Sequence, residues 1–197
     1  VGANHSCVLL NNGQVKCWGS NSYGQLGYGE AVEDIGDEGN EMGDMLPYLD
    51  FGGPAVEALS AGDNHTCALL SDKSVWCWGK NASGQLGQGH TNHVYTPQLV
   101  ALGREDVLSL SSGYDHNCVL LASGQVKCWG EGGFGRLGYG NVDDLGDGAD
   151  EMGEALPALD FGQNVVSLVS NGPNNCVILH DNSLKCWGDN YWGQLGQ

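Results

Sequence analysis

A motif that occurs four times in this chain constrains its fold more than any other feature. The copies occupy residues 2–27, 62–87, 113–138 and 171–196, and they align with one another without gaps. Their first cysteines stand at positions 7, 67, 118 and 176, so one unit occupies between 51 and 60 residues. Self-similarity at such a period is typical of stacked or radially arranged structural units.

Each copy carries the residue pattern of a β-hairpin. In the first copy, an apolar β-rich run at 7–10 is followed by a turn and a second run at 15–18. A further run precedes the hairpin at 56–60, 107–110 and 165–169, and another follows it at 48–51, 98–102 and 158–161. This pattern predicts an all-β chain with about four short antiparallel strands per repeat, which is the content of one β-propeller blade. A solenoid is the alternative, but a four-stranded antiparallel sheet suits radial packing better.

The repeated string resembles a known family. It reads G-x-x-H-x-C-x-L-L and then G-x-V-x-C-W-G-x-N-x-x-G-Q-L-G, and it is similar to the repeat of the regulator of chromosome condensation family, in its cysteine-containing, mostly extracellular variety. The resemblance spans essentially the whole chain. It implies a β-propeller, and members usually close a ring of seven blades, which four repeats cannot supply. We therefore expect residues 1–197 to form one partial propeller domain, completed by additional blades from a longer chain or from another chain.

The eight cysteines form four pairs, and hairpin geometry decides whether the partners meet. If residues 11–13 form a turn with Gly13 in the left-handed conformation, the register places Cys7 opposite Cys17 at a non-hydrogen-bonded position. Gly124 and Asn182 can supply the same turn residue, whereas Lys73 fits it poorly, so we expect another turn in the second repeat. The predicted disulfides are Cys7–Cys17, Cys67–Cys77, Cys118–Cys128 and Cys176–Cys186. Four such bridges predict an oxidising compartment, outside the cell or at the cell surface.

Zinc is the alternative use of these cysteines. His5, Cys7 and Cys17 could supply three ligands, and His65 and His116 recur at the equivalent position. In the fourth repeat Asn174 replaces the histidine while both cysteines remain, which favours disulfides. We expect the histidines to repeat a packing or hydrogen-bonding task. The tryptophans that follow the second cysteines are expected in the core between blades: Trp18, Trp78, Trp129 and Trp187.

Charge narrows the possible partners. The chain has 24 acidic and 7 basic residues and a formal net charge of −17, which disfavours binding to nucleic acid and to anionic membrane surfaces. No apolar stretch approaches the roughly 18 residues that a membrane span needs, so no direct membrane insertion is expected. No set of nucleophile, base and oxyanion donor stands outside the repeated framework, and no phosphate-binding loop of the P-loop type is present. A binding or structural module is therefore favoured over an enzyme.

Two acidic insertions, 30–46 and 141–156, match one another at an offset of 110 residues. The linker 89–103 of the intervening repeat is shorter and nearly free of acidic residues, so the blade does not require the acidic block. Oxygen-rich side chains at this density, with glycines between them, suit calcium, although the spacing is not that of an EF-hand. Solvated surface is the alternative. The candidate calcium ligands are Asp34, Asp37, Asn40, Glu41, Asp44, Asp144, Asp147, Asp150, Glu151 and Glu154.

Two further features concern the surface. The position before each Gly-Gln-Leu-Gly or Gly-Arg-Leu-Gly segment varies, and Tyr23, Phe134 and Trp192 stand there as candidate partner-binding residues on the loop face, with burial against a neighbouring loop as the alternative. Of three sequons, at Asn4, Asn64 and Asn81, the loop position of Asn81 is the expected glycosylation site.

These observations predict a non-enzymatic extracellular scaffold or binding module that engages a protein or glycan partner through its loop face, within a larger surface assembly. Secreted relatives of this repeat family include a β-lactamase inhibitor, which makes a protein partner plausible by analogy of fold. A calcium-dependent carbohydrate-binding module is the alternative. The founding activity of the family, guanine-nucleotide exchange on a small nuclear GTPase, is opposed by the net charge and by the cysteine pairs.

Overall fold

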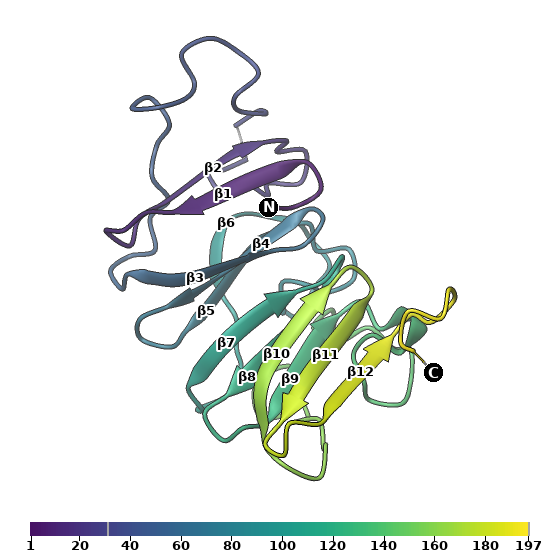
Figure 1. Ribbon diagram of the computed structural model, residues 1–197. Coiled ribbons are helices and arrows are strands. Elements are labelled where there is room, and N and C mark those ends of the chain that lie inside the picture. Colours follow the sequence, from purple (N-terminus) through teal and green to yellow (C-terminus); the bar gives the residue numbers. More distant parts are fainter. Residues whose placement is uncertain (31, 197) are drawn as a thin grey trace.

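Four antiparallel sheets follow one another along an arc in the computed structural model, which describes residues 1–30 and 32–196 (Figure 1). The first sheet contains β1 (His5–Leu9) and β2 (Val15–Gly19). The second contains, in spatial order, β3 (Val56–Ala61), β4 (His65–Leu70), β5 (Val75–Gly79) and β6 (Val94–Leu99). The third contains β7 (Val107–Ser112), β8 (His116–Leu121) and β9 (Val126–Gly130), and the fourth contains β10 (Val165–Asn171), β11 (Asn174–Leu179) and β12 (Leu184–Gly188). The predicted all-β architecture of four blade-like repeats is confirmed.

The two acidic insertions explain why the first and third sheets lack a regular outer strand. In the second repeat a regular strand, β6, pairs with β5, with a shift of register between Cys77 and Gly79, and it lies at 94–99 rather than at the predicted 98–102. In the first repeat the same edge is reduced to two isolated bridges, Gly19 with Ile35 and Val15 with Leu49. The third repeat has the equivalent bridges, Gly130 with Leu145 and Val126 with Leu159. In both repeats the chain pairs with the hairpin at one residue, loops away through the acidic insertion, and then pairs with the hairpin again at a second residue.

All four hairpins use one turn geometry. The third turn residue has a positive φ in each repeat, at 81° for Gly13, 70° for Lys73, 81° for Gly124 and 66° for Asn182. The expectation of a different turn at Lys73 is therefore wrong. There the Asp72 carboxylate accepts hydrogen bonds from the backbone N and the hydroxyl of Ser74, which stabilises the turn despite a residue that disfavours positive φ.

The apolar core lies between neighbouring sheets. Trp78 and Trp129 are fully buried, and each packs among residues of the repeat that precedes it. Near the inner edge of the arc, main-chain hydrogen bonds join consecutive repeats from Ala3 N to Asp63 O, from Asp63 N to Tyr114 O and from Tyr114 N to Gly172 O. No helix in the described ranges has the length and apolar character needed to cross a membrane.

Candidate functional site

Each hairpin is closed by a disulfide that links its two strands. The registers pair Cys7 with Cys17, Cys67 with Cys77, Cys118 with Cys128 and Cys176 with Cys186, and each pair is bonded. The backbone N of Cys17 donates to the Tyr28 hydroxyl at 2.8 Å, away from the hairpin partner, as a non-hydrogen-bonded position requires. The sulfurs are therefore occupied, and zinc ligation by these cysteines does not occur in this structure.

The junction between repeats is built around one main-chain carbonyl. Gln25 O accepts a hydrogen bond from Trp78 Nε1 at 2.9 Å and a second from Thr66 Oγ1 at 3.0 Å. Gln85 O accepts in the same way from Trp129 Nε1 at 3.0 Å and from Asn117 Nδ2 at 2.7 Å. The third junction repeats the arrangement, with Arg136 O bonded by Trp187 Nε1 and Asn175 Nδ2 at 2.9 and 2.7 Å. We refer to this carbonyl with its two donors as the junction carbonyl.

The repeated histidines connect to the same junctions. Nε2 of His65 lies 3.0 Å from Asn117 Oδ1, and Nε2 of His116 lies 2.8 Å from Asn175 Oδ1. Because the amide oxygen can only accept, Nε2 carries the proton and donates. Burial and the nearby His65 lower the pKa of His5 to about 4, and burial lowers the pKa of His116 to about 4. These histidines are neutral at pH 7, and they join repeats rather than face a cleft.

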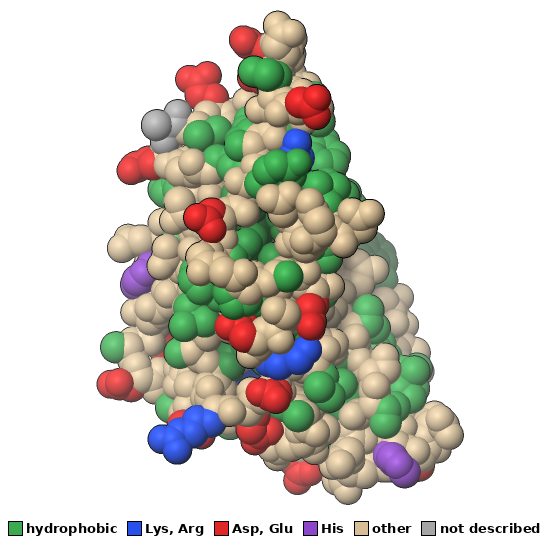
Figure 2. Space-filling view, turned by 90° about the vertical axis from the view of Figure 1, so that its left-hand side faces the viewer, with side chains coloured by type: hydrophobic (Ala, Val, Ile, Leu, Met, Phe, Trp, Pro, Cys, Tyr) green, Lys and Arg blue, Asp and Glu red, His purple; other side chains and the backbone are tan. Residues whose placement is uncertain are grey.

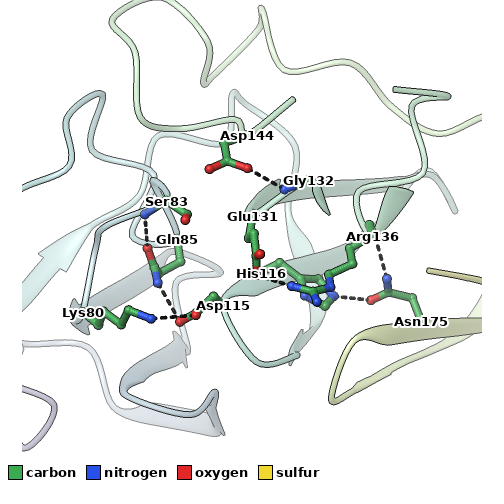
Figure 3. Close-up of polar contacts among 10 residues, drawn as sticks. All are labelled: Lys80, Ser83, Gln85, Asp115, His116, Glu131, Gly132, Arg136, Asp144 and Asn175. Carbon is green, nitrogen blue, oxygen red and sulfur yellow. Dashed lines mark hydrogen bonds and ion pairs between the residues drawn. The ribbon is translucent and has the colours of Figure 1, made fainter. Parts of the chain in front are cut away.

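Charged side chains reinforce the junctions near the loop face, as Figure 3 shows. Lys80 Nζ lies 2.7 Å from Asp115 Oδ2, and Gln85 Nε2 donates to Asp115 Oδ1 at 2.8 Å. Gln85 Oε1 in turn accepts the backbone N of Ser83 at 2.9 Å. The second repeat is thus joined to the third through the Asp115 carboxylate.

In each acidic insertion, one glutamate carboxylate accepts hydrogen bonds from backbone N–H groups of the same insertion. Glu151 Oε2 accepts the N–H groups of Gly146 and Gly148 at 2.8 and 2.9 Å. Glu41 Oε2 accepts those of Gly36 and Glu38 at 2.7 and 3.1 Å, and these bonds lower the pKa of Glu41. Each carboxylate therefore bonds the backbone of its own loop.

Calcium binding by these insertions remains a prediction. Within residues 1–30 and 32–196, no three His, Cys, Asp or Glu side chains come together in a group that could hold a metal ion. Two of the proposed ligands serve as caps at the start of the turns, because Asp34 Oδ1 accepts Asn21 N at 2.7 Å and Asp144 Oδ1 accepts Gly132 N at 2.8 Å. These hydrogen bonds give Asp34 and Asp144 a role in their own turns. The proposed set comprised Asp34, Asp37, Asn40, Glu41, Asp44, Asp144, Asp147, Asp150, Glu151 and Glu154.

The two insertions differ in what they contact. The second lies against the second repeat: Gly89 N donates to Gly146 O at 2.9 Å, and Met152 packs on the core cluster that contains Trp129. The first insertion instead borders an open hollow of about 500 Å³. Acidic side chains are spread over the molecular face shown in Figure 2, with few basic ones among them. The hollow is lined by Asn21, Ser22, Val32, Glu33, Asp34, Ile35, Asp37, Glu38 and Glu41.

The three aromatic residues predicted to bind a partner lie on different repeats and differ in exposure. Tyr23 is 36% exposed and packs edge-on against His93, with ring centroids 5.1 Å apart. Phe134 is 64% exposed, has a φ of 58° and lies 5.3 Å from the guanidinium carbon of Arg136. Trp192 is 82% exposed and contacts Tyr191. Phe134 and Trp192 therefore offer accessible rings, whereas Tyr23 is partly covered.

The predicted glycosylation site at Asn81 is wrong. Asn81 is fully buried, its Nδ2 donates to His90 O at 2.6 Å, and its Oδ1 accepts Leu86 N at 2.9 Å. The equivalent Asn21 has the same role, with Oδ1 accepting Leu26 N at 2.9 Å. This asparagine holds the turn in the first, second and fourth repeats, whereas the third repeat has Gly132 at the position. The amide of Asn81 is therefore not available to carry a glycan.

Sequence reasoning missed the polar donors of the junction carbonyl. Thr66, Asn117 and Asn175 were not singled out, although each directly follows the histidine or asparagine of its motif and precedes the first cysteine. A polar residue flanked by buried positions on a strand between two packed sheets is the signal that could have identified them.

Comparison with known proteins places this geometry among related molecules. A sequence model of the Regulator of chromosome condensation (RCC1) repeat matches residues 1–25, 56–85 and 107–136, and a second model of the same repeat matches 72–120, so that together they cover more than half of the chain. The chain is 29% identical over 198 residues to the E3 ubiquitin-protein ligase HERC2 of Mus musculus, covering 100% of this chain and 4% of that protein. It is 27% identical over 197 residues to the ultraviolet-B receptor UVR8 of Arabidopsis thaliana, covering 99% of this chain and 41% of the receptor.

Solved structures show the same repeat arrangement. Yeast RCC1 (Prp20), determined with bound Kap60, matches with a TM-score of 0.77 at 27% identity, over 100% of this chain and 44% of that one. The CRINKLY WD40 ectodomain of the Arabidopsis thaliana receptor kinase ACR4 matches in fold, with a TM-score of 0.56 at 23% identity over 96% of this chain and 49% of that one. The chain spans less than half of the length of each of these four proteins.

Proposed function

Because this chain belongs to the regulator of chromosome condensation repeat family, we propose that it is a non-enzymatic protein-binding module that acts outside the cell and engages a basic partner surface through its loop face. Protein binding is a property of a relative that matches the whole chain, since Prp20p of Saccharomyces cerevisiae is described by its binding to Gsp1p and histones. A net charge of −17 favours a partner of opposite charge by electrostatic steering and complementarity.

Phe134 is the observation that carries the proposal. An aromatic residue rarely adopts a positive φ, and such strain concentrates at functional positions. Here φ is 58°, and the turn presents 64% of the residue to solvent with the Arg136 guanidinium beside the ring. The guanidinium is itself paired with Glu131 (Figure 3). This ion pair holds the cation beside the Phe134 ring. Exposed aromatic and arginine side chains held in place are the residue types that dominate binding energy at protein interfaces.

A selection experiment tests this function without a known partner. A library of displayed peptides is selected on the disulfide-bonded chain, and the enriched peptides are measured against Phe134→Ala and against the control Leu108→Ala, which removes a residue that is 57% exposed on β7. We expect enrichment of lysine and arginine, at least about tenfold weaker binding to Phe134→Ala, unchanged binding to Leu108→Ala, and weakening by salt. Binders that are indifferent to Phe134 would contradict the assignment, and a chelator-sensitive signal on a glycan array would favour the carbohydrate-binding alternative.

The extracellular assignment rests on the four hairpin disulfides. Cytosolic and nuclear reductants keep most protein thiols reduced, so four structural bridges in one chain favour an oxidising compartment. Thiol labelling of the protein as isolated from its source, followed by mass mapping of a non-reduced digest, tests it. Full labelling of all eight cysteines would place the protein in a reducing compartment.

A further inference from the structure

The loop 88–93, which leads from the turn of the second repeat into β6, is held by two imidazole nitrogens. His93 Nδ1 accepts a hydrogen bond from Asn81 N at 3.1 Å, and His90 Nδ1 accepts one from Asn92 N at 3.2 Å. A backbone N–H can only donate, so each Nδ1 presents a lone pair and the proton of each ring is on Nε2. Both imidazoles are therefore neutral in this conformation of the loop.

The first and third repeats use a carboxylate where the second repeat uses His93. The equivalent turn N–H is accepted by Asp34 Oδ1 from Asn21 at 2.7 Å and by Asp144 Oδ1 from Gly132 at 2.8 Å. Histidine side chains ordinarily gain a proton between about pH 8 and pH 5, whereas carboxylates ordinarily stay charged down to about pH 4. A protonated imidazole has two donors and no acceptor. Of these three equivalent bonds, only the one in the second repeat is therefore incompatible with mild acid.

The titratable side chains around His93 come from three elements. The turn of the first repeat contributes Tyr23, whose ring meets the imidazole edge-on with centroids 5.1 Å apart. The loop itself contributes His90, and the second insertion brings Asp147 to the same turn. Lys80, which precedes the turn, is already paired with a carboxylate of the third repeat. Within residues 1–30 and 32–196 neither imidazole forms an ion pair, so the bond from the turn is the interaction that a proton on His93 removes.

Main-chain hydrogen bonds hold both ends of the loop independently of the imidazoles. At its start, Gly89 N donates to Gly146 O of the second insertion at 2.9 Å. Just after its end, Tyr95 O in β6 accepts Gly29 N of the first repeat at 2.9 Å. Loss of the imidazole bonds therefore frees only the segment between these two anchors and leaves the junctions between repeats in place.

We propose that the loop 88–93 is a pH-sensitive element that is closed at neutral pH and opens in mild acid. A proton added to His93 Nδ1 turns the acceptor into a donor that faces the N–H of Asn81, so this hydrogen bond breaks. His90 loses its backbone donor in the same way. Tyr23 then loses the ring that partly covers it and joins the exposed loop face. The chain alone carries this change, so the proposal does not depend on the proposed partner.

Nitrogen NMR of the disulfide-bonded chain tests the proposal directly. At pH 7.5 the imidazole 15N shifts are expected to place the proton of His93 on Nε2. Between pH 7.5 and pH 5.0, the hydrogen-exchange protection factor of the Asn81 amide, corrected for the intrinsic effect of pH, is expected to fall at least about tenfold. The amides of Asn21 and Gly132, which bond carboxylates, are internal controls and should keep theirs within about twofold. These controls separate opening of the loop from a general loss of stability in acid.

Two substitutions separate His93 from the other histidines. His93→Asp gives the second repeat the carboxylate that its neighbours carry, so the pH response at Asn81 is expected to disappear. His180→Asn replaces an exposed histidine of the fourth repeat and should leave the response intact. Circular dichroism verifies that each variant is folded, and the comparison of Asn81 with Asn21 in the unmodified chain decides without them.

Three results would overturn the proposal. The first is a proton on Nδ1 of His93 at pH 7.5, because that nitrogen could not then accept a hydrogen bond. The second is an Asn81 amide whose protection stays constant down to pH 5.0 or falls only as much as that of Asn21. The third is an equal fall in folded His93→Asp. Nuclear Overhauser effects between the rings of Tyr23 and His93 should disappear over the same pH range, and their persistence at pH 5.0 would also contradict opening.

Discussion

The indole Nε1 of Trp129 donates a hydrogen bond to the main-chain carbonyl of Gln85, 3.0 Å away in the preceding repeat. Asn117 Nδ2 bonds the same oxygen at 2.7 Å, and His65 Nε2 bonds the Asn117 amide oxygen. One buried carbonyl thus joins a tryptophan, an asparagine and a histidine from two repeats. The junction combines apolar burial with hydrogen bonds that fix the register between neighbouring sheets.

Trp129→Phe is expected to lower the free energy of unfolding by about 2–4 kcal/mol. The phenyl ring keeps most of the apolar contact but loses the Nε1 donor and leaves a cavity in a fully packed core. Chemical denaturation of the disulfide-bonded protein measures the loss. Trp192→Phe is the matched control, because Trp192 is 82% exposed and its replacement should change stability by less than about 0.5 kcal/mol. Equal effects of the two substitutions would mean that the junction bond contributes nothing.

Removing one hairpin disulfide, as Cys118→Ala with Cys128→Ala, is expected to cost about 3 kcal/mol. The two residues are ten positions apart, and the chain-entropy relation gives a value of this size for a loop of that length. Thermal unfolding of the double variant under non-reducing conditions measures the effect, and adding reductant to the unmodified chain should lower its melting temperature further because all four bridges are lost. A double variant as stable as the unmodified chain would show that the bridge constrains the unfolded state very little.

Much of the fold was predictable because the residues within one repeat determine the hairpin of that repeat. The spacing of Cys7 and Cys17 around a turn gave the register, and four copies of that hairpin gave the blades. What failed depended on contacts from elsewhere in the chain. Asn81 reads as a loop sequon, yet the turn folds around its amide, and Lys73 reads as a poor turn residue, yet Asp72 and Ser74 stabilise its conformation.

The acidic insertions show the same limit. Their composition suggested a cation, but which oxygen faces which amide depends on the folded loop, where Glu151 accepts Gly146 N and Gly148 N. The junction donors also became visible only when the repeats were packed together, because Asn117 and Gln85 are 32 residues apart in sequence. The local sequence pattern therefore determines the fold of each repeat. The packing between repeats determines which hydrogen bonds its polar side chains form.

Glu151→Ala is expected to destabilise the chain by about 1–2 kcal/mol, and more than Glu41→Ala does. Both substitutions remove an acceptor of two backbone N–H groups. The second insertion additionally packs on the second repeat through Met152 and Gly146, so its disorder would expose part of that core. Urea unfolding of the pair compares the two insertions directly. A larger effect at Glu41 would contradict this difference in packing.

Calcium is expected to leave the melting temperature of the chain unchanged within about 1 °C. The described carboxylates bring no three ligands together, and those of Glu41 and Glu151 already bond their own loops. A specific site would stabilise the folded protein by about 1.4 kcal/mol at ten times its dissociation constant. Thermal melts of chelator-treated protein with and without millimolar calcium, together with calorimetric titration, measure this. Saturable heat that is lost in Glu151→Ala would confirm the predicted calcium site.

Acid is expected to destabilise the chain through its buried histidines. The folded state holds the pKa of His5 and His116 at about 4, against about 6.5 in the unfolded chain, so below pH 6.5 the unfolded state binds more protons. The free energy of unfolding should therefore fall as the pH falls from about 6.5 to about 4, by up to about 3 kcal/mol for each of these histidines, and the histidine contribution should level off below that.

The fourth repeat supplies the control for this prediction, because it carries Asn174 where the others carry histidine. His116→Asn removes one titrating group while keeping an amide that can donate to Asn175 Oδ1, so this variant should lose less stability between pH 7 and pH 4 than the unmodified chain. Urea unfolding at closely spaced pH values compares the two slopes. Parallel curves would assign the acid sensitivity to the carboxylates instead, since protonation of groups such as Glu41, whose pKa is lowered by its backbone hydrogen bonds, also removes stability as the pH falls.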